Sequence, residues 1–321
     1  MSATANSTIV LANPRGFCAG VDRAIEIVDE LLDLYGAPVY VRKEIVHNRE
    51  VVADFRARGV IFVDELSEVP AGALAVFSAH GVSPAVRDEA VARGLRVVDA
   101  TCPLVSKVHL EALRFAREGL FLLLVGHGGH DEVVGTLGHV PGGIALVEDA
   151  AQAETVHVPD PGRVALITQT TLGVDETKDI IAVLRRRFPA LREPARSDIC
   201  YATTNRQAAV KELAARSQIV VVVGSENSSN SLRLRDVAQA EGARAYLVDD
   251  PELVRAEWFA DVQRIGVTAG ASSSEALVQR VVERIRAFAP GANSSESGER
   301  EPEIVFAPPR ELAALRAAAT G

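Results

Sequence analysis

The chain is 321 residues long and carries 34 lysines and arginines against 43 aspartates and glutamates, a net charge of −9. Its 48% hydrophobic and 24% charged residues are ordinary for a globular protein, but the acidic balance argues against general nucleic-acid binding, which needs a basic face. The longest apolar runs, such as Leu120–Val125, fall far short of the roughly 20 residues of a membrane span. The N-terminus has no secretory-signal pattern, so we expect a cytoplasmic protein with no membrane partner.

Short runs of aliphatic and β-branched residues alternate with helical patterns along the whole chain. Between the runs, apolar residues recur every three or four positions, as on one face of a helix. Most runs are continuously apolar, as in strands covered on both faces. The pattern predicts an α/β fold with mostly parallel sheets. The predicted strands are Thr8–Ala12, Val39–Val41, Leu74–Ser78, Val97–Asp99, Phe121–Val125, Val164–Thr168, Ile219–Val223, Ala245–Val248 and Ile265–Thr268.

Three cysteines, Cys18, Cys102 and Cys200, occur in the same local setting, an extended segment followed by the cysteine and then a helix. Pro103 suits a first helical turn and so places Cys102 at a helix start. This weak repeat predicts three similar lobes around a shared centre: residues 1–101 with the first cysteine, 102–196 with the second and 197–287 with the third. Residues 288–321 are expected to form a Gly/Ser/Glu-rich flexible linker and a C-terminal tail whose apolar segment IVFAPPREL could dock back.

An odd, sparse set of cysteines has two interpretations, buried small residues or ligands of a metal. A helix N-terminus favours the thiolate, and thiolates bind soft metals and iron–sulfur clusters. Three ligands leave one metal position open, as catalysis requires. The shared setting favours a joint metal site, although three unrelated buried cysteines stay the alternative.

Five predicted strands end in small, polar or His-bearing turns, and a sixth segment, VHN, follows the strand at Val39–Val41. In parallel α/β sheets, ligands bind beyond the carboxyl ends of the strands, and such turns let backbone N–H groups approach an anion. The inventory suits a phosphate or diphosphate, although each turn alone is equally ordinary as a helix cap. The candidate side chains are His47, His80, His130, Thr170, Thr171, Ser228, Ser229, Asn230 and Ser272.

Glu132 lies two residues after His130 in a Gly-rich turn. A carboxyl group near a buried anion would have a raised pKa and could deliver a proton. The competing interpretation of Glu132 is a solvated loop acid.

Several segments occur together and in order: PRGFCAGVDRAI, VHN, FSAHGVS, DATCPLV, GHxxHxE, TQTTL, DICYATTNRQ, GSxNSSN and GVTAGAS. Together they resemble the 4-hydroxy-3-methylbut-2-enyl diphosphate reductase family from about Ile9 to about Ile285. The resemblance implies a trefoil of three α/β lobes around a central [4Fe-4S] cluster with one iron not bound by protein.

By position, the resemblance implies that Cys18, Cys102 and Cys200 are the cluster ligands. It implies that Glu132 delivers the proton, together with Thr170 and His130 as catalytic residues. Thr171 lies in the same motif as Thr170, and we choose Thr170. The implied substrate-binding residues are His47, His80, His130, Thr170, Ser228, Ser229, Asn230 and Ser272.

The family reaction removes the allylic hydroxyl of the substrate as water after two electrons and two protons are supplied. Its products are isopentenyl and dimethylallyl diphosphate, at the last step of the non-mevalonate isoprenoid pathway. The resemblance implies a ferredoxin or flavodoxin as electron donor. Two alternatives come from other classes: a three-Cys zinc hydrolase, and an iron–sulfur sensor that binds a diphosphate without turnover.

The sequence departs from the family pattern after TAGAS, where the family often has Pro and this chain has Ser274 nearby. Because Ser can cap a helix, we expect only a small local effect. The first eight or so residues carry no family motif.

Overall fold

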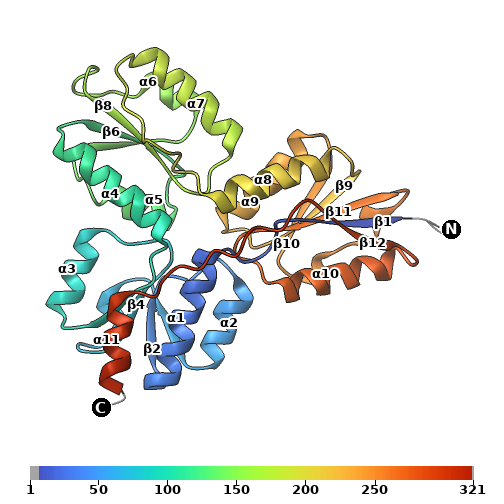
Figure 1. Cartoon of the computed structure of the whole chain (residues 1–321), viewed down its shortest axis with the longest axis horizontal. Helices are drawn as coiled ribbons and strands as arrows, with labels where there is room; N and C mark the ends of the chain where they lie inside the picture. Colours follow the sequence, from blue (N-terminus) through green and yellow to red (C-terminus); the bar gives the residue numbers. More distant parts are fainter. Residues whose placement is uncertain (1–6, 320–321) are drawn as a thin grey trace. The chain divides into compact units, whose positions relative to one another are not determined.

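The computed structural model describes residues 7–319, so the N-terminal extension lies largely outside the described residues. The chain divides into two compact units (Figure 1). Unit 1 comprises residues up to Cys18, His47–Arg49 and Tyr201–Ile304; unit 2 comprises Ala19–Val46, Glu50–Cys200 and the residues from Val305 onward.

Unit 1 is built on a five-stranded parallel sheet with the strand order β10-β9-β11-β1-β12. The strands are β1 (Thr8–Ala12), β9 (Ile219–Val223), β10 (Arg244–Val248), β11 (Arg264–Ala269) and β12 (Asn293–Ser297). Its longer helices are α8 (Tyr201–Ala214), α9 (Ser229–Ala240) and α10 (Glu275–Phe288). Two short 3-10 helices, Pro251–Leu253 and Ala256–Phe259, follow β10.

Both faces of this sheet are covered, and β9 shows how its sequence allows this. Its run IVVVV is fully buried, and alternate side chains point to opposite faces. Val221 packs in one core cluster with residues of α10, and Val222 packs in another with residues of α8 and α9. A continuous apolar run is therefore needed here, because neither face meets water.

Unit 2 holds two smaller parallel sheets. One has the order β3-β2-β4-β5 and the other the order β7-β6-β8. Their strands are β2 (Val39–Arg42), β3 (Val60–Val63), β4 (Leu74–Phe77), β5 (Arg96–Asp99), β6 (Phe121–Val125), β7 (Ile144–Val147) and β8 (Val164–Thr168). The helices of the first part are α1 (Ala19–Tyr35), α2 (Arg49–Ala57), a 3-10 turn at Leu66–Glu68 and α3 (Pro84–Ala92). Those of the second part are α4 (Pro103–Arg117), α5 (Asp131–Leu137), α6 (Ala150–Thr155) and α7 (Val174–Arg187).

The second sheet of unit 2 is also packed on both faces. Leu122 and Leu124 of β6 lie in a cluster with residues of α4 and α5. Leu123 and Val125 of the same strand lie in a cluster with residues of α6 and α7. Polar groups that the sequence places just beyond these strands are thereby held on a rigid base.

The α/β class with parallel sheets is confirmed, and all nine predicted strands are present, within one residue at each end. Three further strands of the described residues, β3, β7 and β12, were not predicted. Each lies at the edge of its sheet, where one side of the strand has no neighbour. The polar sequence NSSES of β12 carries no hydrophobic signal, whereas VIFV of β3 and IALV of β7 are apolar runs that the prediction omitted. Cys102 is the residue before α4, and Ser274 caps α10 by accepting a hydrogen bond from the Leu277 amide at 3.1 Å, both as expected.

The predicted lobe boundaries do not coincide with the sheets. β1 was assigned to the first lobe, but it pairs with β11 and β12 in the sheet of the third. The expectation of a flexible linker is wrong for Asn293–Ser297, because this segment is β12. Polar composition suggested mobility, yet backbone groups make a strand ladder whatever the side chains, and the side chains of β12 are mostly exposed at the edge.

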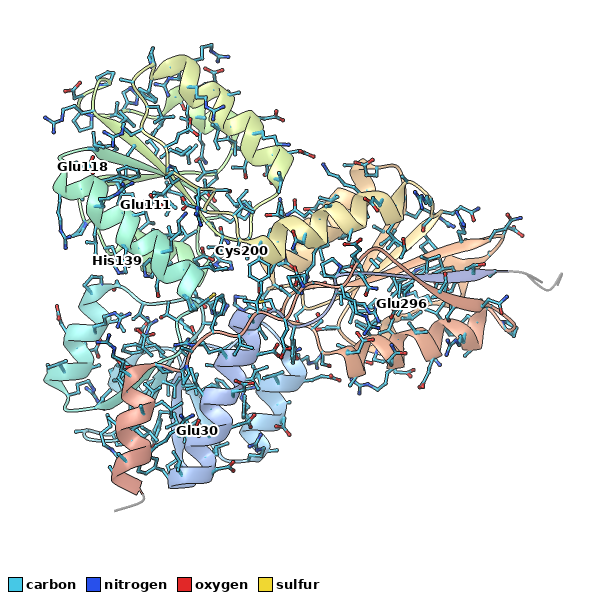
Figure 2. The ribbon with its side chains drawn as sticks, in the orientation of Figure 1. Glu30, Glu111, Glu118, His139, Cys200 and Glu296 are labelled. Atoms are coloured by element: carbon cyan, nitrogen blue, oxygen red, sulfur yellow. The ribbon has the colours of Figure 1, made fainter. Side chains whose placement is uncertain are left out.

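The C-terminal tail docks within unit 2, where helix α11 (Arg310–Ala319) contacts α1 and β5. Leu312 is only 1% exposed. The Tyr35 hydroxyl donates to the Leu315 carbonyl at 2.9 Å, and Arg316 pairs with Glu30 of α1 (Figure 2). No helix among the described residues is long and apolar enough to cross a membrane.

Candidate active site

Each of the three cysteines lies directly before a long helix: Cys18 before α1, Cys102 before α4 and Cys200 before α8, the last labelled in Figure 2. All three are partly buried, and none forms a disulfide. A position at a helix N-terminus stabilises the thiolate form that binds metals. Cys102 and Cys200 belong to unit 2, and Cys18 belongs to unit 1.

Each cysteine is also tied to the end of a strand by its backbone amide. The Cys18 amide donates to the Ala271 carbonyl at 3.1 Å, the Cys102 amide to Ala79 at 2.9 Å, and the Cys200 amide to Thr170 at 3.0 Å. The accepting residue is in every case the second residue after a strand, following β11, β4 and β8 respectively. The repeat inferred from the sequence therefore recurs in the structure as the same backbone hydrogen bond at each cysteine. This bond links each cysteine to a predicted substrate-binding turn.

In unit 1, the predicted polar residues form one buried cluster around the start of α9. Ser228 is the residue before this helix, and its hydroxyl lies 3.4 Å from that of Ser272. The Asn230 side-chain oxygen accepts a hydrogen bond from the Ala271 amide at 2.9 Å. Ser228, Ser229, Asn230 and Ser272 are each between 4% and 7% exposed. The start of a helix lined by small hydroxyl and amide groups is suited to an anion.

The segment His47–Arg49 belongs to the same cluster. The Ser272 hydroxyl donates to the His47 carbonyl at 2.9 Å, and the Asn48 side-chain amide donates to the Ser272 carbonyl at 2.5 Å. Asn48, which is 4% exposed, was not among the predicted site residues. The sequence did offer a signal for it, because Asn48 is the last residue of the VHN segment, from which only His47 was predicted as a site residue.

In unit 2, Glu132 and Thr170 form a buried pair. The Thr170 amide donates to Glu132 Oε1 at 2.7 Å, and the Thr170 hydroxyl donates to Glu132 Oε2 at 2.9 Å. The Thr171 hydroxyl instead accepts a hydrogen bond from Gln169 Nε2 at 2.9 Å. Of the two threonines left open by the sequence, Thr170 is thus the one on the carboxylate.

Burial dominates the chemistry of Glu132, which is 2% exposed. The pKa of its carboxyl group is raised to about 7 by all effects together. Desolvation is the largest effect and raises the pKa, the two hydrogen bonds from Thr170 lower it, and the charge of Asp198 raises it. The interpretation of Glu132 as a solvated loop acid is therefore wrong. A carboxyl group that titrates near neutrality can hold a proton and release it.

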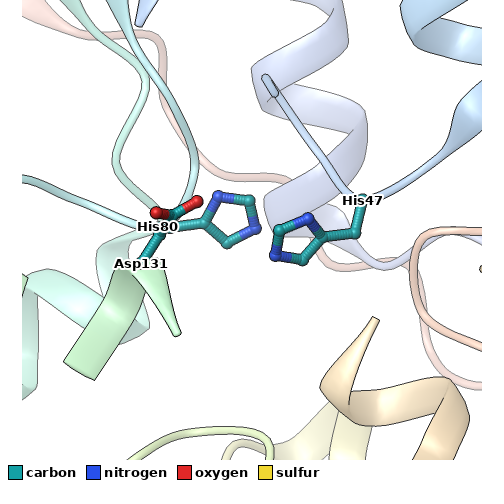
Figure 3. Close-up of side chains that lie close together, drawn as sticks. All are labelled: His47, His80 and Asp131. Carbon is teal, nitrogen blue, oxygen red and sulfur yellow. The ribbon is translucent and has the colours of Figure 1, made fainter. Parts of the chain in front are cut away.

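Two histidines lie close to this pair. The His130 imidazole caps α5, because its Nδ1 accepts a hydrogen bond from the Glu132 amide at 3.1 Å. The His80 ring meets the His130 ring edge-on at a centroid distance of 5.8 Å. A ring nitrogen of His80 also lies within 4.8 Å of a carboxylate oxygen of Asp131 (Figure 3). Unit 2 thus brings together His80, His130, Glu132 and Thr170.

The donor set fits an iron–sulfur cluster. Each thiol lies at the start of a helix, and its backbone is fixed by a strand-end carbonyl. Thiolates are the soft ligands that iron–sulfur clusters take.

Sequence reasoning missed Asp198, which is 4% exposed. Its carboxylate accepts hydrogen bonds from the Thr168 amide at 3.0 Å and from Lys107 Nζ at 2.7 Å. It is therefore the residue that fixes the loop leading to Cys200 against the end of β8. The sequence did offer a signal for it, because Asp198 is the first residue of the motif DICYATTNRQ, from which only Cys200 was predicted as a site residue.

Comparison with protein families matches residues 9–286 to the LytB protein model. The 4-hydroxy-3-methylbut-2-enyl diphosphate reductase of Hahella chejuensis is 57% identical over 308 residues, which cover 95% of this chain and 97% of that protein. The 4-hydroxy-3-methylbut-2-enyl diphosphate reductase 2 of Burkholderia mallei is 57% identical over 284 residues, covering 88% of this chain and 87% of that protein.

Two solved structures are also similar. The E-1-hydroxy-2-methyl-but-2-enyl-4-diphosphate reductase of Plasmodium falciparum has a TM-score of 0.94 at 34% identity and covers 98% of this chain and 100% of its own. A structure of (E)-4-hydroxy-3-methyl-but-2-enyl diphosphate reductase, described as the terminal enzyme of the non-mevalonate pathway, has a TM-score of 0.62 at 32% identity, covering 88% of this chain and 99% of its own.

Proposed function

This chain belongs to the LytB protein family, and from that premise we propose that it is a 4-hydroxy-3-methylbut-2-enyl diphosphate reductase. It is an oxidoreductase of isoprenoid biosynthesis by the non-mevalonate route, in agreement with the names of its relatives. Those names support neither alternative, a zinc hydrolase or a sensor. A trefoil of three lobes around the cofactor is part of the proposal.

The cofactor we propose is one [4Fe-4S] cluster held by Cys18, Cys102 and Cys200, with one iron lacking a protein ligand. When bound, such a cluster supplies electrons and a Lewis-acid position for the substrate hydroxyl oxygen. The reducing conditions of the cytoplasm suit thiolate ligands, and we place the enzyme there.

The proposed reaction is a reductive dehydroxylation. The allylic carbon–oxygen bond of the substrate breaks, one proton leaves with the hydroxyl as water, and a second proton forms the new carbon–hydrogen bond. The two electrons come from outside, and we propose a ferredoxin or flavodoxin as their donor. Protonation at either end of the allylic system gives isopentenyl or dimethylallyl diphosphate.

The observation that carries the proposal is the position of Thr170 between an acid and a cysteine. Its carbonyl accepts the Cys200 amide at 3.0 Å, while its amide and hydroxyl both donate to Glu132. Glu132 would therefore hold a proton next to a cluster ligand, and the Thr170 hydroxyl would relay it to the leaving oxygen. His130 orients the start of α5, on which Glu132 lies.

The polar side chains would hold the diphosphate. Around the start of α9, the hydroxyl and amide groups of Ser228, Ser229, Asn230 and Ser272 offer hydrogen bonds to an anion at a helix N-terminus. The imidazoles of His47, His80 and His130 would add donors. Holding the anionic end of the substrate fixes its hydroxyl end, which is catalysis by positioning.

Iron and acid-labile sulfide per chain, measured with a visible spectrum after anaerobic purification, test the proposal. We expect about four of each and a brown protein that bleaches on reduction. Reductant with 4-hydroxy-3-methylbut-2-enyl diphosphate should then give both products. Zinc in place of iron would support the hydrolase, and tight diphosphate binding to an iron–sulfur protein without product would support the sensor. Either result would overturn the proposal.

A further inference from the structure

Each helix that begins at a cysteine carries a basic residue about one and a half turns later. Arg23 on α1 lies five residues after Cys18, Lys107 on α4 lies five after Cys102, and Arg206 on α8 lies six after Cys200. Each cation is directed at backbone carbonyls shortly before a different cysteine.

Arg23 contacts the loop that leads to Cys102. Its Nη1 donates to the Ala100 carbonyl at 3.3 Å and to the Thr101 carbonyl at 3.1 Å, and its Nε donates to the Ala307 carbonyl of the C-terminal segment at 2.8 Å. The residue is 8% exposed. One buried guanidinium thus joins α1, the approach to Cys102 and the tail.

Lys107 contacts the loop that leads to Cys200. Its Nζ donates to the Arg196 carbonyl at 2.9 Å, the Ser197 carbonyl at 3.3 Å and Asp198 Oδ1 at 2.7 Å. The Asp198 side chain is fully buried, and the Lys107 side chain is 37% exposed.

Arg206 contacts the loop that leads to Cys18. Its Nη2 donates to the Gly16 carbonyl at 2.8 Å and to the Phe17 carbonyl at 3.4 Å. Its Nη1 pairs with Glu301 at 3.1 Å, and the residue is 1% exposed. All of these groups belong to unit 1, as all those around Arg23 and Lys107 belong to unit 2.

We propose that Arg23, Lys107 and Arg206 are positioning residues for the three cluster cysteines, arranged as a closed cycle. The helix after the first cysteine clamps the loop of the second, the helix after the second clamps the loop of the third, and the helix after the third clamps the loop of the first. A cation with several donors fixes two carbonyls at once, and bonds to a charged donor are stronger than neutral ones. The inference rests on the proposed function, because the cycle has a purpose only if the three cysteines bind one group.

The three cations differ in their countercharges. Lys107 pairs with Asp198 and Glu111, and Arg206 pairs with Glu301. Arg23 makes its hydrogen bonds to carbonyls alone, and among the described residues no carboxylate lies within ion-pair distance of it. The negative charges that act on it, those of Cys102, Asp99 and Glu311, do so without a direct ion pair. Its positive charge next to Cys102 therefore also favours the reduced, more negative state of a cluster held there.

Four variants of the full-length protein, purified anaerobically with their cofactor, test this: Arg23→Gln, Arg23→Lys, Lys107→Met and Lys107→Arg. Arg117→Gln is the matched control, because Arg117 is exposed at the end of α4 and the same charge is lost. We measure iron release to a chelator and the midpoint potential. Arg23→Gln and Lys107→Met should release iron roughly tenfold faster than wild type. The two conservative variants should recover most of the loss, and Arg117→Gln should match wild type.

The potential separates positioning from general destabilisation. Arg23→Gln should lower the midpoint potential, whereas Arg23→Lys, which keeps the charge, should leave it near wild type. Folded Arg23→Gln and Lys107→Met proteins with unchanged iron release and potential would overturn the inference. If the wild type itself holds no iron, the proposed function fails instead. Hydrogen exchange of the Cys102 and Cys200 amides still tests the clamps in that case: unchanged exchange in both variants would refute them.

Discussion

The carboxylate of Glu132 accepts both hydrogen bonds that Thr170 can donate, at 2.7 Å from the amide and 2.9 Å from the hydroxyl. The pair is buried, so water does not compete for either hydrogen bond. This arrangement joins the strand end of β8 to helix α5 and holds a titratable group at a fixed place. Burial raises the pKa of Glu132 to about 7, although both hydrogen bonds from Thr170 are kept.

Replacing Glu132 with Gln should keep the fold and the iron content but lower turnover by about 100-fold or more, since the amide cannot deliver a proton. The measurement is the steady-state rate with an artificial reductant, beside iron content. Asp131→Asn, at the adjacent position on the same helix, is the control for altered local charge. Wild-type rates in Glu132→Gln would remove this residue from the mechanism.

The pH dependence of turnover should show a limb near pH 7, above which the rate falls, because the pKa of Glu132 is about 7 and we propose its protonated form as the donor. Thr170→Val removes a hydrogen bond that lowers this pKa, so the limb should move to higher pH. A limb at the same pH in wild type and Thr170→Val would assign it to another group.

The same pKa predicts a slope in stability. Because the folded pKa lies above the ordinary value of 4.5, the folded protein keeps a proton that the unfolded chain releases, and stability should fall as pH rises from about 4.5 to about 7. The contribution is at most about 3 kcal/mol. Urea unfolding at several pH values checks this against Glu132→Gln, which should lack this part of the slope.

Asp198→Asn should change two properties at once. Loss of the negative charge lowers the pKa of Glu132, so the alkaline limb should move to lower pH, opposite to Thr170→Val. Loss of the ion pair to the partly exposed Lys107 should cost about 1–3 kcal/mol of unfolding free energy. Asp175→Asn, which breaks a surface pair with Lys178, should do neither. An unmoved limb in Asp198→Asn would show that this charge does not act on Glu132.

Gly270→Ala should weaken substrate binding through Ser231. A methyl group at position 270 would occupy the place of the Ser231 hydroxyl, which donates to the Ser228 hydroxyl at 3.0 Å. We expect KM for the diphosphate substrate to rise roughly tenfold and stability to fall by about 1–3 kcal/mol.

Adding Ser231→Ala should restore the stability of Gly270→Ala, because the remaining Cβ would lie 3.2 Å from the new methyl group. It should not restore KM, because the hydrogen bond from Ser231 to Ser228 is still lost. The same addition should not rescue Gly224→Ala, whose methyl group would lie 2.6 Å from the Ser231 Cβ itself. Equal rescue of both variants would show that the crowding involves another atom.

Leu312→Ala should destabilise the protein by about 2–4 kcal/mol, because this side chain of α11 is buried. Val305→Ala, at a position that is 79% exposed, should change stability by less than about 0.5 kcal/mol. Urea unfolding of the two variants gives both values. A loss of under 0.5 kcal/mol in Leu312→Ala would mean that the tail is undocked in solution.

Much of the fold is readable from the sequence because its signals are local. A continuously apolar run such as Ile219–Val223 predicts a strand covered on both faces, and it is one. The setting of each cysteine before a helix is local too, as Pro103 shows for Cys102. The ordered motifs also identify the family, since their residues and their order along the chain are themselves features of the sequence.

The tertiary structure decided what depends on distant partners. β1 joins β11 across more than 250 residues, and the polar segment Asn293–Ser297 becomes a strand only because β1 offers it a free edge. Thr170 and Thr171 are equivalent by type, and only the place of Glu132 separates them. Burial of Glu132 and the targets of the three cations likewise follow from packing between segments far apart in sequence, which no local pattern encodes.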